Sequence, residues 1–444
     1  MAKPTKEELL DIVEKEEVEF IEFQFMDILG TVKCMSVPVA RMERALDEGI
    51  LFDGSSIVGY ATIDESDMRA HPDHDTFLIF PWTEGRMKTA RMICDIFTID
   101  GKRFRGDPRY ILQRQMDKAK EIGFVFNTGP EFEFFLFKLD EHGEPTTTPT
   151  DHGGYFDLLP LDQAERVRKE TALYLDQLKF NVERTTHEVS PGQHEIDLRY
   201  DDALSIADRI LMLKHAIKTV ALQHNLWATF MPKPVYGVNG SGMHVHQSLF
   251  TAEGENAFYD PKAKNELSKT MTHYIAGILN HAKDNCAILN SWVNSYKRIV
   301  PGFEAPAYIS WANRNRSALV RVPAGRGAAT RIEVRNPDPA GNPYLQFAVM
   351  LASGLDGIKK RLDPPDPVEK DLFVMSQKDR EKNGIESLPA NLGHALSYFA
   401  KSELMKDTLG EHAFNHFIVI KQREWDTYRT QVTRWEIENY LKVL

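Results

Sequence analysis

Cysteine is scarce in this sequence: only Cys34, Cys94 and Cys286 occur in 444 residues, and they lie far apart. No CxxC pair is present, so neither a disulfide framework nor a thiolate zinc site is expected. No apolar run approaches the roughly 18 residues of a membrane helix, and the first residues, MAKPTKEELL, lack the apolar centre of a signal peptide. We therefore expect a protein of the reducing cytoplasm without a membrane segment.

Positively charged residues are also fewer than negatively charged ones. The chain has 54 Lys and Arg against 65 Asp and Glu, a net charge of −11, and its only short basic stretch is GKRFRGDPR. This balance favours solubility and argues against nucleic acid as a direct partner. It does not exclude ATP, because a nucleotide needs only a local cluster of positive side chains. Common phosphate loops are missing too: GVNGSGMH has neither the P-loop Lys-Ser/Thr nor the G-x-G-x-x-G order, and by itself it predicts a turn.

Several local patterns predict regular structure at the start of the chain. Thr5 and Glu8 have the spacing of a capping box that begins a helix. Ile21, Phe23 and Phe25 then alternate with polar residues, as in a half-buried strand, and the strand-like segments TFLIFPW and ARMICDIF follow. The first hundred residues therefore predict a small β-rich domain.

Residues 100–110, DGKRFRGDPRY, are rich in glycine, proline and charge and form the expected linker. It would separate an N-terminal domain, residues 1–103, from a larger domain, residues 104–444. In the larger domain, apolar residues at helical spacing predict helices over 164–178 and 206–220. Strands that alternate polar with apolar residues indicate an antiparallel sheet with one open, wet face. The expected fold class is α+β.

Two glutamates lie side by side on a strand in GPEFEFFLF, where Glu131 and Glu133 share one face. Two such carboxylates repel each other and resist burial, so their pairing suggests a bound cation. Similar patterns occur in HEVSPGQHEID, NGSGMHVHQS and TRIEVRNPD. They contribute Glu188, Glu195, His244, His246, Arg331, Glu333 and Arg335.

Each segment alone is more often a solvated face, a surface histidine or a cross-strand ion pair. Their recurrence on several amphipathic strands favours a common site. A donor set rich in carboxylates, with one or two imidazoles and no thiolate, favours Mg²⁺ or Mn²⁺ over zinc. It suffices for two adjacent cations, which would clamp phosphoryl oxygens. Arg314, Arg316 and Arg321 could then offset phosphate charge and hold a carboxylate substrate.

Eight ordered segments resemble the signature segments of bacterial-type (type I) glutamine synthetase, and the resemblance covers essentially the whole chain. They are FDGSSI, ESDM, GPEFEFFLF, HEVSPGQHEID, KPVYGVNGSGMHVHQS, NSYKRIVPGFEAP, NRSALVRVP and TRIEVRNPDPAGNPYL. The resemblance implies an N-terminal β-grasp domain and a catalytic domain whose curved antiparallel sheet is flanked by helices. It also implies a dodecamer of two stacked hexamers with active sites between subunits. The implied substrates are ATP, L-glutamate and ammonium, with two or more Mg²⁺ or Mn²⁺ ions per site.

The resemblance also implies roles for individual residues. The ligands of the first metal would be Glu133, Glu188 and Glu195, and those of the second Glu131, His244 and Glu333. Nucleotide binding would fall to His246, Ser248, Arg321 and Arg331. Glutamate binding would fall to Gly240, Arg298 and Arg335. The catalytic group would comprise Asp53 and Asp67, which bind and deprotonate ammonium, with the phosphate-facing Arg316 and the flap residue Glu304.

Two departures bear on regulation. Type I enzymes controlled by adenylylation carry a tyrosine shortly before a Leu-Pro, but residues 379–392 contain none, as in the unmodified α subtype. Many α members have an arginine linked to glutamine feedback where this chain has Thr62, which predicts weak feedback inhibition. Whether a regulatory protein also binds is left open.

Two other functions fit the same fold. A γ-glutamyl ligase for a larger amine would need a more open, apolar amine site in place of Asp53 and Asp67. A non-catalytic regulatory relative could lose metal ligands freely, whereas all six are present here. We therefore expect an ATP-dependent ligase that forms glutamine through γ-glutamyl phosphate.

Overall fold

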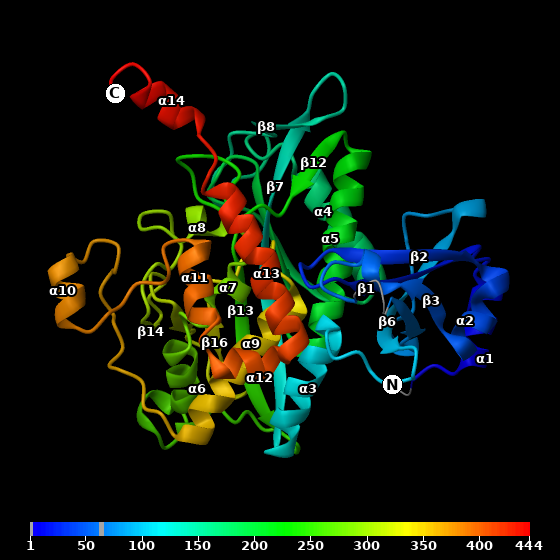
Figure 1. Cartoon of the computed structure of the whole chain (residues 1–444), viewed down its shortest axis with the longest axis horizontal. Helices are drawn as coiled ribbons and strands as arrows, with labels where there is room; N and C mark the ends of the chain where they lie inside the picture. Colours follow the sequence, from blue (N-terminus) through cyan, green and yellow to red (C-terminus); the bar gives the residue numbers. More distant parts are fainter. Residues whose placement is uncertain (1–2, 62–65) are drawn as a thin grey trace.

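The computed structural model describes residues 3–61 and 66–444, which form a small N-terminal part and a larger part (Figure 1). Each part contains a hydrophobic core of its own. Strands and helices are mixed in both, so the predicted α+β class is confirmed. Thr62, which carries the expectation about feedback, lies outside the described residues.

The N-terminal part is a mixed sheet with two helices. Its elements are α1 (Lys6–Lys15), β1 (Phe20–Met26), β2 (Val32–Pro38), α2 (Met42–Glu48), β3 (Ile50–Asp53), β4 (Asp67–Pro72), β5 (Leu78–Ile79) and β6 (Thr89–Thr98). The strand order is β2-β1-β6-β4-β3, with β5 paired to β6, and β1 runs parallel to β6. The predicted capping box is present: the Glu8 N–H donates to Thr5 Oγ1, and the Thr5 N–H donates to Glu8 Oε2.

Three expectations about this part need correction. Strand β1 is more than half-buried, because it lies between two strands and its Met26 packs into the core of the larger part. TFLIFPW pairs only at Leu78–Ile79. The linker is shorter than predicted, since Phe104 packs into the N-terminal core and Tyr110 already lies in the first turn of α3 (Pro108–Glu121).

The larger part is built on one long sheet. Its strands are β7 (Phe124–Leu139), β8 (Pro145–Pro149), β9 (Val182–His187), β10 (Gln193–Leu198), β11 (Asp201–Asp202), β12 (Leu226–Thr229), β13 (Met243–Thr251), β14 (Trp311–Asn313), β15 (Val320–Val322) and β16 (Ile332–Val334). The order is β14-β15-β16-β13-β7-β10-β9. All these pairs are antiparallel, as predicted, except β14 with β15.

The polar face of this sheet is recessed, which corrects the expectation of an open, wet face. Glu133 and Glu195, which lie opposite each other on β7 and β10, are only 6% and 5% exposed. The reason is that the loops between the strands form walls around the polar face and enclose a cavity of about 890 Å³.

The helices of the larger part that follow α3 are α4 (Glu165–Gln177), α5 (Ala203–Gln223), α6 (Lys269–Asn280), α7 (Cys286–Leu289), α8 (Ser295–Arg298), α9 (Pro343–Lys360), α10 (Gln377–Lys382), α11 (Leu392–Phe399), α12 (Glu403–Leu409), α13 (Glu411–Tyr428) and α14 (Arg434–Tyr440). Of these, α4 packs against β9 and β10, and α5 packs against β7 and β12. The helices predicted over 164–178 and 206–220 correspond to α4 and α5. Helix α9 is buried along most of its length.

Helices α6 and α9 cross closely at two glycines. A Cβ on Gly277 would lie 2.1 Å from the Ser353 carbonyl oxygen, and one on Gly357 would lie 2.2 Å from the His273 carbonyl oxygen. Only glycine fits at this crossing, because any side chain would press against backbone rather than against a flexible group.

A buried arginine joins the two parts of the chain. Arg109 of α3 contacts Asp73 (2.8 Å) and Asp95 (2.6 Å) of the N-terminal part and Asp208 of α5 (2.9 Å). The Tyr344 hydroxyl of α9 also donates to Asp208 Oδ1 at 2.6 Å. One guanidinium therefore fixes elements from both cores against each other.

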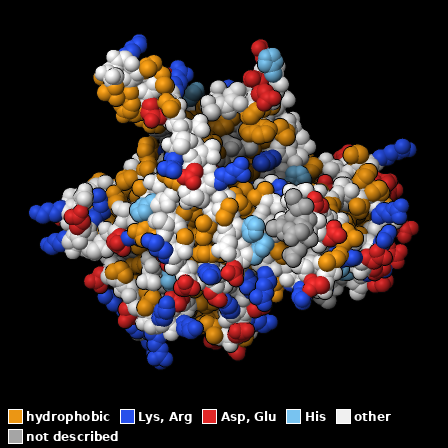
Figure 2. Space-filling model, viewed as in Figure 1, with side chains coloured by type: hydrophobic (Ala, Val, Ile, Leu, Met, Phe, Trp, Pro, Cys, Tyr) orange, Lys and Arg blue, Asp and Glu red, His pale blue; other side chains and the backbone are white. Residues whose placement is uncertain are grey.

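The surface is mixed in charge: Lys and Arg are interspersed with Asp and Glu on the face that Figure 2 shows. The C-terminal helix α14 projects away from the body and exposes apolar side chains such as Trp435 and Leu441 (Figures 1 and 2). In the described ranges, no helix combines the length and the apolar character needed to cross a bilayer.

Candidate active site

Strand register brings the predicted metal ligands together. Glu133 of β7 lies opposite Glu195 of β10, and Glu131 lies opposite His244 of β13. The same ladder continues outward, where Glu333 of β16 pairs with His246 of β13 and with Arg321 of β15. Because these positions differ by even numbers along each strand, their side chains share the polar face.

The first carboxylate cluster comprises Glu133, Glu188 and Glu195, which all line the cavity. Burial, together with repulsion from Glu188, raises the pKa of Glu133 to about 8. Burial and repulsion from neighbouring carboxylates raise the pKa of Glu195 to about 11 and that of Glu188 to about 7. Such a group of hard oxygen donors is strained by its own negative charge, so a divalent cation fits it well.

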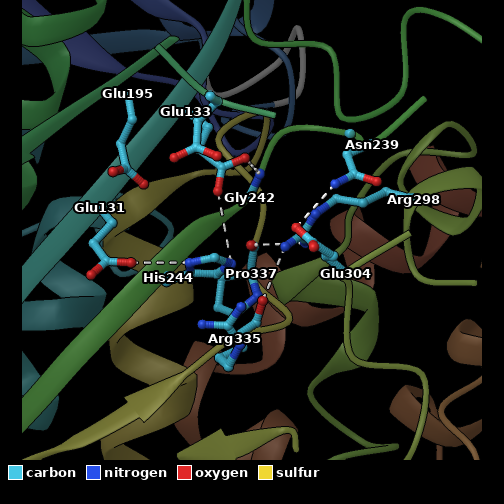
Figure 3. Close-up of polar contacts among 12 residues, drawn as sticks. Glu131, Glu133, Glu195, Asn239, Gly242, His244, Arg298, Glu304, Arg335 and Pro337 are labelled. Atoms are coloured by element: carbon cyan, nitrogen blue, oxygen red, sulfur yellow. Dashed lines mark hydrogen bonds and ion pairs between the residues drawn. The ribbon is translucent and has the colours of Figure 1, made fainter. Parts of the chain in front are cut away.

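The position of Glu133 is fixed by two donors. The Gly242 N–H donates to Glu133 Oε2 at 2.8 Å, and Gln193 Nε2 donates to the same oxygen at 2.9 Å (Figure 3). The second carboxylate oxygen takes no part in these bonds and remains available as a ligand.

The second cluster comprises Glu131, His244 and Glu333, whose ligand atoms lie within 4.8 Å of one another. His244 Nδ1 is 3.1 Å from Glu131 Oε2 and 3.9 Å from Glu333 Oε1. Burial, aided by the charge of Arg335, lowers the pKa of His244 to about 4. The imidazole is therefore neutral at pH 7, which is the form that binds a metal.

Arginines balance the outer carboxylate of this cluster. Arg321 and Arg335 both form ion pairs with Glu333. Although burial opposes ionisation, the charge of Arg335 lowers the pKa of Glu333 to about 2. Arg316 and Arg331 also line the cavity, so positive charge faces the carboxylates across the same space.

A second cavity, of about 550 Å³, adjoins the first, and both are lined by Glu131, Arg184, His246 and Arg331. Ser248 lines only the second. The predicted nucleotide residues His246, Ser248 and Arg331 thus lie together, and Arg331 Nε donates to His246 Nδ1 at 3.2 Å.

The predicted glutamate residues Gly240, Arg298 and Arg335 all line the main cavity. Arg298 is buried, and its guanidinium donates to the carbonyl oxygens of Asn336 (2.8 Å), Pro337 (3.1 Å) and Arg335 (3.1 Å) (Figure 3). A Cβ on Gly242 would lie 2.4 Å from Arg298 Nη2, so the loop beside Gly240 must be glycine-rich to pass this side chain.

The predicted flap residue Glu304 lies over the cavity. Its φ of +53° is unusual for a residue with a side chain. Asn239 Nδ2 donates to Glu304 Oε2 at 3.1 Å, which links the flap to the loop that contains Gly240 (Figure 3).

Asp53 and Asp67 are not at this cavity. They lie opposite each other on β3 and β4 of the N-terminal part. Asp53 accepts hydrogen bonds from the Ser55 N–H and from the hydroxyls of Ser55 and Ser56, which lower the pKa of its carboxyl. The two aspartates are thus brought together, but apart from the metal clusters of the same chain.

Four residues that line the site were missed from the sequence. Asp197 lies opposite both Glu131 and Arg184, and Arg184 Nη2 lies 2.6 Å from Asp197 Oδ2. Gln193 holds Glu133, and Asn239 holds the flap. Strand alternation would have identified Gln193 and Asp197, because residues two positions apart share a face and both therefore lie on the same face of β10 as Glu195.

A separate buried group, Asp151, His187 and His194, also brings three ligand atoms within 4.8 Å. Arg168 can only donate, so its 2.7 Å contact makes His194 Nδ1 an acceptor and places the proton on Nε2. His187 lies between two acceptors, the Glu188 carbonyl (2.7 Å) and Asp151 Oδ1 (3.0 Å), which favours the doubly protonated ring. Neither ring offers a free lone pair, so this group is a hydrogen-bonded support rather than a metal site.

Comparison with known proteins agrees with this geometry. The family profile "Glutamine synthetase, beta-Grasp domain" matches residues 17–99, and "Glutamine synthetase, catalytic domain" matches residues 105–440. A glutamine synthetase of Clostridium saccharobutylicum is 50% identical over 441 residues, covering 99% of both chains. One of Staphylococcus aureus (strain Mu50) is 52% identical over 439 residues, covering 99% of this chain and 98% of the relative.

Solved structures agree at the level of the fold. A structure described as "GmaS/ADP complex-Conformation 1" superposes with a TM-score of 0.90 at 32% identity, covering 98% of this chain and 99% of the other. "Apo GmaS without ligand" superposes with a TM-score of 0.88 at the same identity and coverage. Both the β-grasp domain and the resemblance inferred from the eight motifs are confirmed, and the chain belongs to the glutamine synthetase family.

Proposed function

We propose that this chain joins ammonia to the γ-carboxylate of L-glutamate at the expense of ATP, giving L-glutamine, ADP and phosphate. The observation that carries the proposal is the pairing of two hard-ligand clusters with several arginines around one cavity, in a chain half identical to curated glutamine synthetases. A carboxylate oxygen of glutamate would attack the γ-phosphorus of ATP and release ADP. The ammonia nitrogen would then attack the acyl carbon, and phosphate would leave.

Glu133, Glu188 and Glu195 would hold one Mg²⁺ or Mn²⁺ ion, and Glu131, His244 and Glu333 another. When bound, such ions neutralise and orient the oxygens of the transferred phosphoryl group. His246, Ser248, Arg321 and Arg331 would bind the nucleotide. The solved relative described as an ADP complex supports nucleotide binding by this fold.

Gly240, Arg298 and Arg335 would hold glutamate in the main cavity, and Arg316 would offset the charge that develops on the phosphoryl oxygens. Glu304 would close over the acyl phosphate and exclude water, which otherwise competes with ammonia. The hydrogen bond that Glu304 accepts from Asn239, which lines the same cavity, supports this role.

Asp53 and Asp67 would bind ammonium and accept its proton before attack. Since both lie on the N-terminal part, away from the clusters of their own chain, they would act in the site of a neighbouring copy. This arrangement supports an oligomer with shared sites, and we propose two stacked hexamers. We further propose a boundary between domains 1–103 and 104–444, a cytoplasmic location, and no control by adenylylation.

The test is phosphate release with glutamate and ATP, comparing ammonium with a panel of primary amines at equal concentration. Ammonium should support the fastest release and yield glutamine. If a larger amine supports faster release, the chain is instead a γ-glutamyl ligase for that amine. If no amine stimulates release with Mg²⁺ or Mn²⁺ present, the proposal fails.

A further inference from the structure

Lys233 is a buried cation without a carboxylate partner in the described ranges. Its side chain is 8% exposed, and the loss of water lowers the pKa of its ammonium. Its backbone is fixed in place: the Lys233 N–H donates to Asn294 Oδ1 at 2.7 Å, and Asn294 Nδ2 donates to the Lys233 carbonyl at 3.0 Å. An ammonium in such a position must find its partners among neutral groups.

Those partners are a carbonyl and an aromatic ring. Lys233 Nζ donates to the Val238 carbonyl within its own loop. It also lies 3.7 Å from the centroid of the Phe303 ring, the residue that precedes Glu304 in the flap. A cation over a ring face at this distance, shielded from water, is a strong form of the cation–π contact.

The flap itself has little other support. Pro301, Gly302 and Glu304 are exposed, and both Gly302 and Glu304 have positive φ, at +92° and +53°. Phe303 is half-buried and lines the cavity. The position of this segment in the structure therefore depends on few contacts, of which two come from the loop of residues 230–242: Lys233 with Phe303, and Asn239 with Glu304.

We propose that Lys233 is a positioning residue that holds the flap closed through its contact with the Phe303 ring. The loop that contains Gly240 and the flap would then move as one unit, so that ordering the loop around the substrate also closes the lid. The kinetic part of this inference rests on the proposed function, whereas the structural part does not.

The structural test is hydrogen exchange at the amides of Val300 and residues 302–305 in the full chain without substrates. Lys233→Met keeps the length of the side chain and removes the charge, and Phe303→Leu keeps apolar bulk and removes the ring. Each should speed flap exchange by about three- to thirtyfold, the range expected for loss of one cation–π contact. Lys233→Arg and Phe303→Trp retain a cation and a ring and should keep exchange near wild type.

The double variant Lys233→Met/Phe303→Leu decides whether the two residues act as a pair. It should exchange no faster than either single variant, because one contact is lost only once. Independent, multiplicative effects would overturn the proposal, and so would unchanged exchange in Lys233→Met. Circular dichroism checks that each variant folds, and Phe303→Leu covers the case in which the Lys233 variant does not.

The kinetic test is the ratio of phosphate released to glutamine formed. Lys233→Met and Phe303→Leu should each raise this ratio, whereas Phe303→Trp should keep the wild-type ratio. The KM for ATP should stay near the wild-type value in all three variants. Lys233→Met could raise the ratio of phosphate to glutamine without changing hydrogen exchange at the flap. The raised ratio would then have a cause other than flap position, and the inference would be overturned. If neither the wild type nor any variant forms glutamine, the proposed function fails. The role of Lys233 is then decided by hydrogen exchange at the flap alone.

Discussion

At the scale of single residues, the first carboxylate cluster binds protons that a metal ion would have to displace. Glu133 and Glu195, with pKa values raised to about 8 and about 11, stay protonated in the metal-free protein near pH 7. A cation must displace these protons before it can bind the carboxylates. The folded, metal-free chain also binds more protons here than the unfolded chain, so its stability falls as pH rises through these values.

We therefore predict that Mn²⁺ binding releases at least about one proton per chain at pH 7 and tightens as pH rises to 8. Calorimetric titration in two buffers with different ionisation enthalpies measures the release. Glu195→Gln carries no displaceable proton at that position and should release fewer while binding Mn²⁺ more weakly. Equal release in wild type and variant would contradict the assignment of Glu195 as a ligand.

The sequence predicted the polar faces of these strands but not everything on them. Alternation assigns Glu131 and Glu133 to one face, because the period of a strand is two. It does not say which residue of a distant strand lies opposite, since register depends on turns and on hydrogen bonds between strands. Alternation could have placed Asp197 on the polar face beside Glu195, but not opposite Glu131 and Arg184. The backbone contacts of Arg298 are likewise a matter of tertiary structure.

At the scale of helices and strands, the elements predicted from the sequence agree best with the observed ones where a single apolar stripe packs on the core. The predicted helices at α4 and α5 formed because apolar side chains at helical spacing pack on the sheet. The expected strand in TFLIFPW is short because Pro81 has no N–H for a ladder. The β14 and β15 pair is parallel, which alternation cannot reveal, because both directions have the same period.

The crossing of α6 and α9 gives a prediction about stability. Gly277→Ala should lower the free energy of unfolding by about 3 kcal/mol, since its Cβ would meet the Ser353 carbonyl at 2.1 Å and force the helices apart. Lys269→Ala on the exposed side of α6 is the matched control and should change stability by less than about 0.5 kcal/mol. Urea denaturation measures the free energy of unfolding of both variants. If the two substitutions change it by similar amounts, the close contact between α6 and α9 does not exclude a side chain at Gly277.

His281, at the end of α6, gives a prediction about pH. It lies 2.8 Å from Asp356 of α9 and 3.1 Å from Asp284. Although burial opposes the charge, these carboxylates raise the pKa of His281 above its usual value of 6.5. The charged contacts therefore stabilise the fold fully below the pKa of the unfolded chain, and this contribution is lost as pH rises through the folded pKa.

Wild type should thus exceed His281→Asn in stability by about 1–2 kcal/mol more at pH 5.5 than at pH 9. Chemical denaturation of both proteins at the two pH values tests this. A difference between them that does not change with pH would show that His281 contributes by packing alone.

At the scale of the whole molecule, the positions of Asp53 and Glu304 predict shared active sites. Asp53→Ala and Glu304→Ala should each form little glutamine. Oligomers co-assembled from equal amounts of the two variants should regain about a quarter of the wild-type sites, because random pairing leaves both residues intact at that fraction of interfaces.

Differently tagged variants, co-expressed and purified through both tags, provide the mixed oligomer. Separately purified variants that are combined without exchange of subunits are the control. No recovery in the mixed oligomer would place Asp53 and Glu304 in the same chain's site and would remove the main support for the shared arrangement.

The Arg109 contacts limit how this chain can be recombined with its relatives. A chimera that takes its N-terminal part from one parent and its remainder from another must keep Asp73, Asp95 and Asp208 matched to one arginine. If the arginine is lost, Lys3 still lies 2.9 Å from Asp73 and Arg103 2.8 Å from Asp95, but Asp208 loses its cationic partner. Breaking a buried ion pair in this way costs roughly 3–5 kcal/mol. The exchangeable modules of this protein are therefore not its two domains as the cores define them, but segments chosen so that the arginine and all three aspartates come from the same parent.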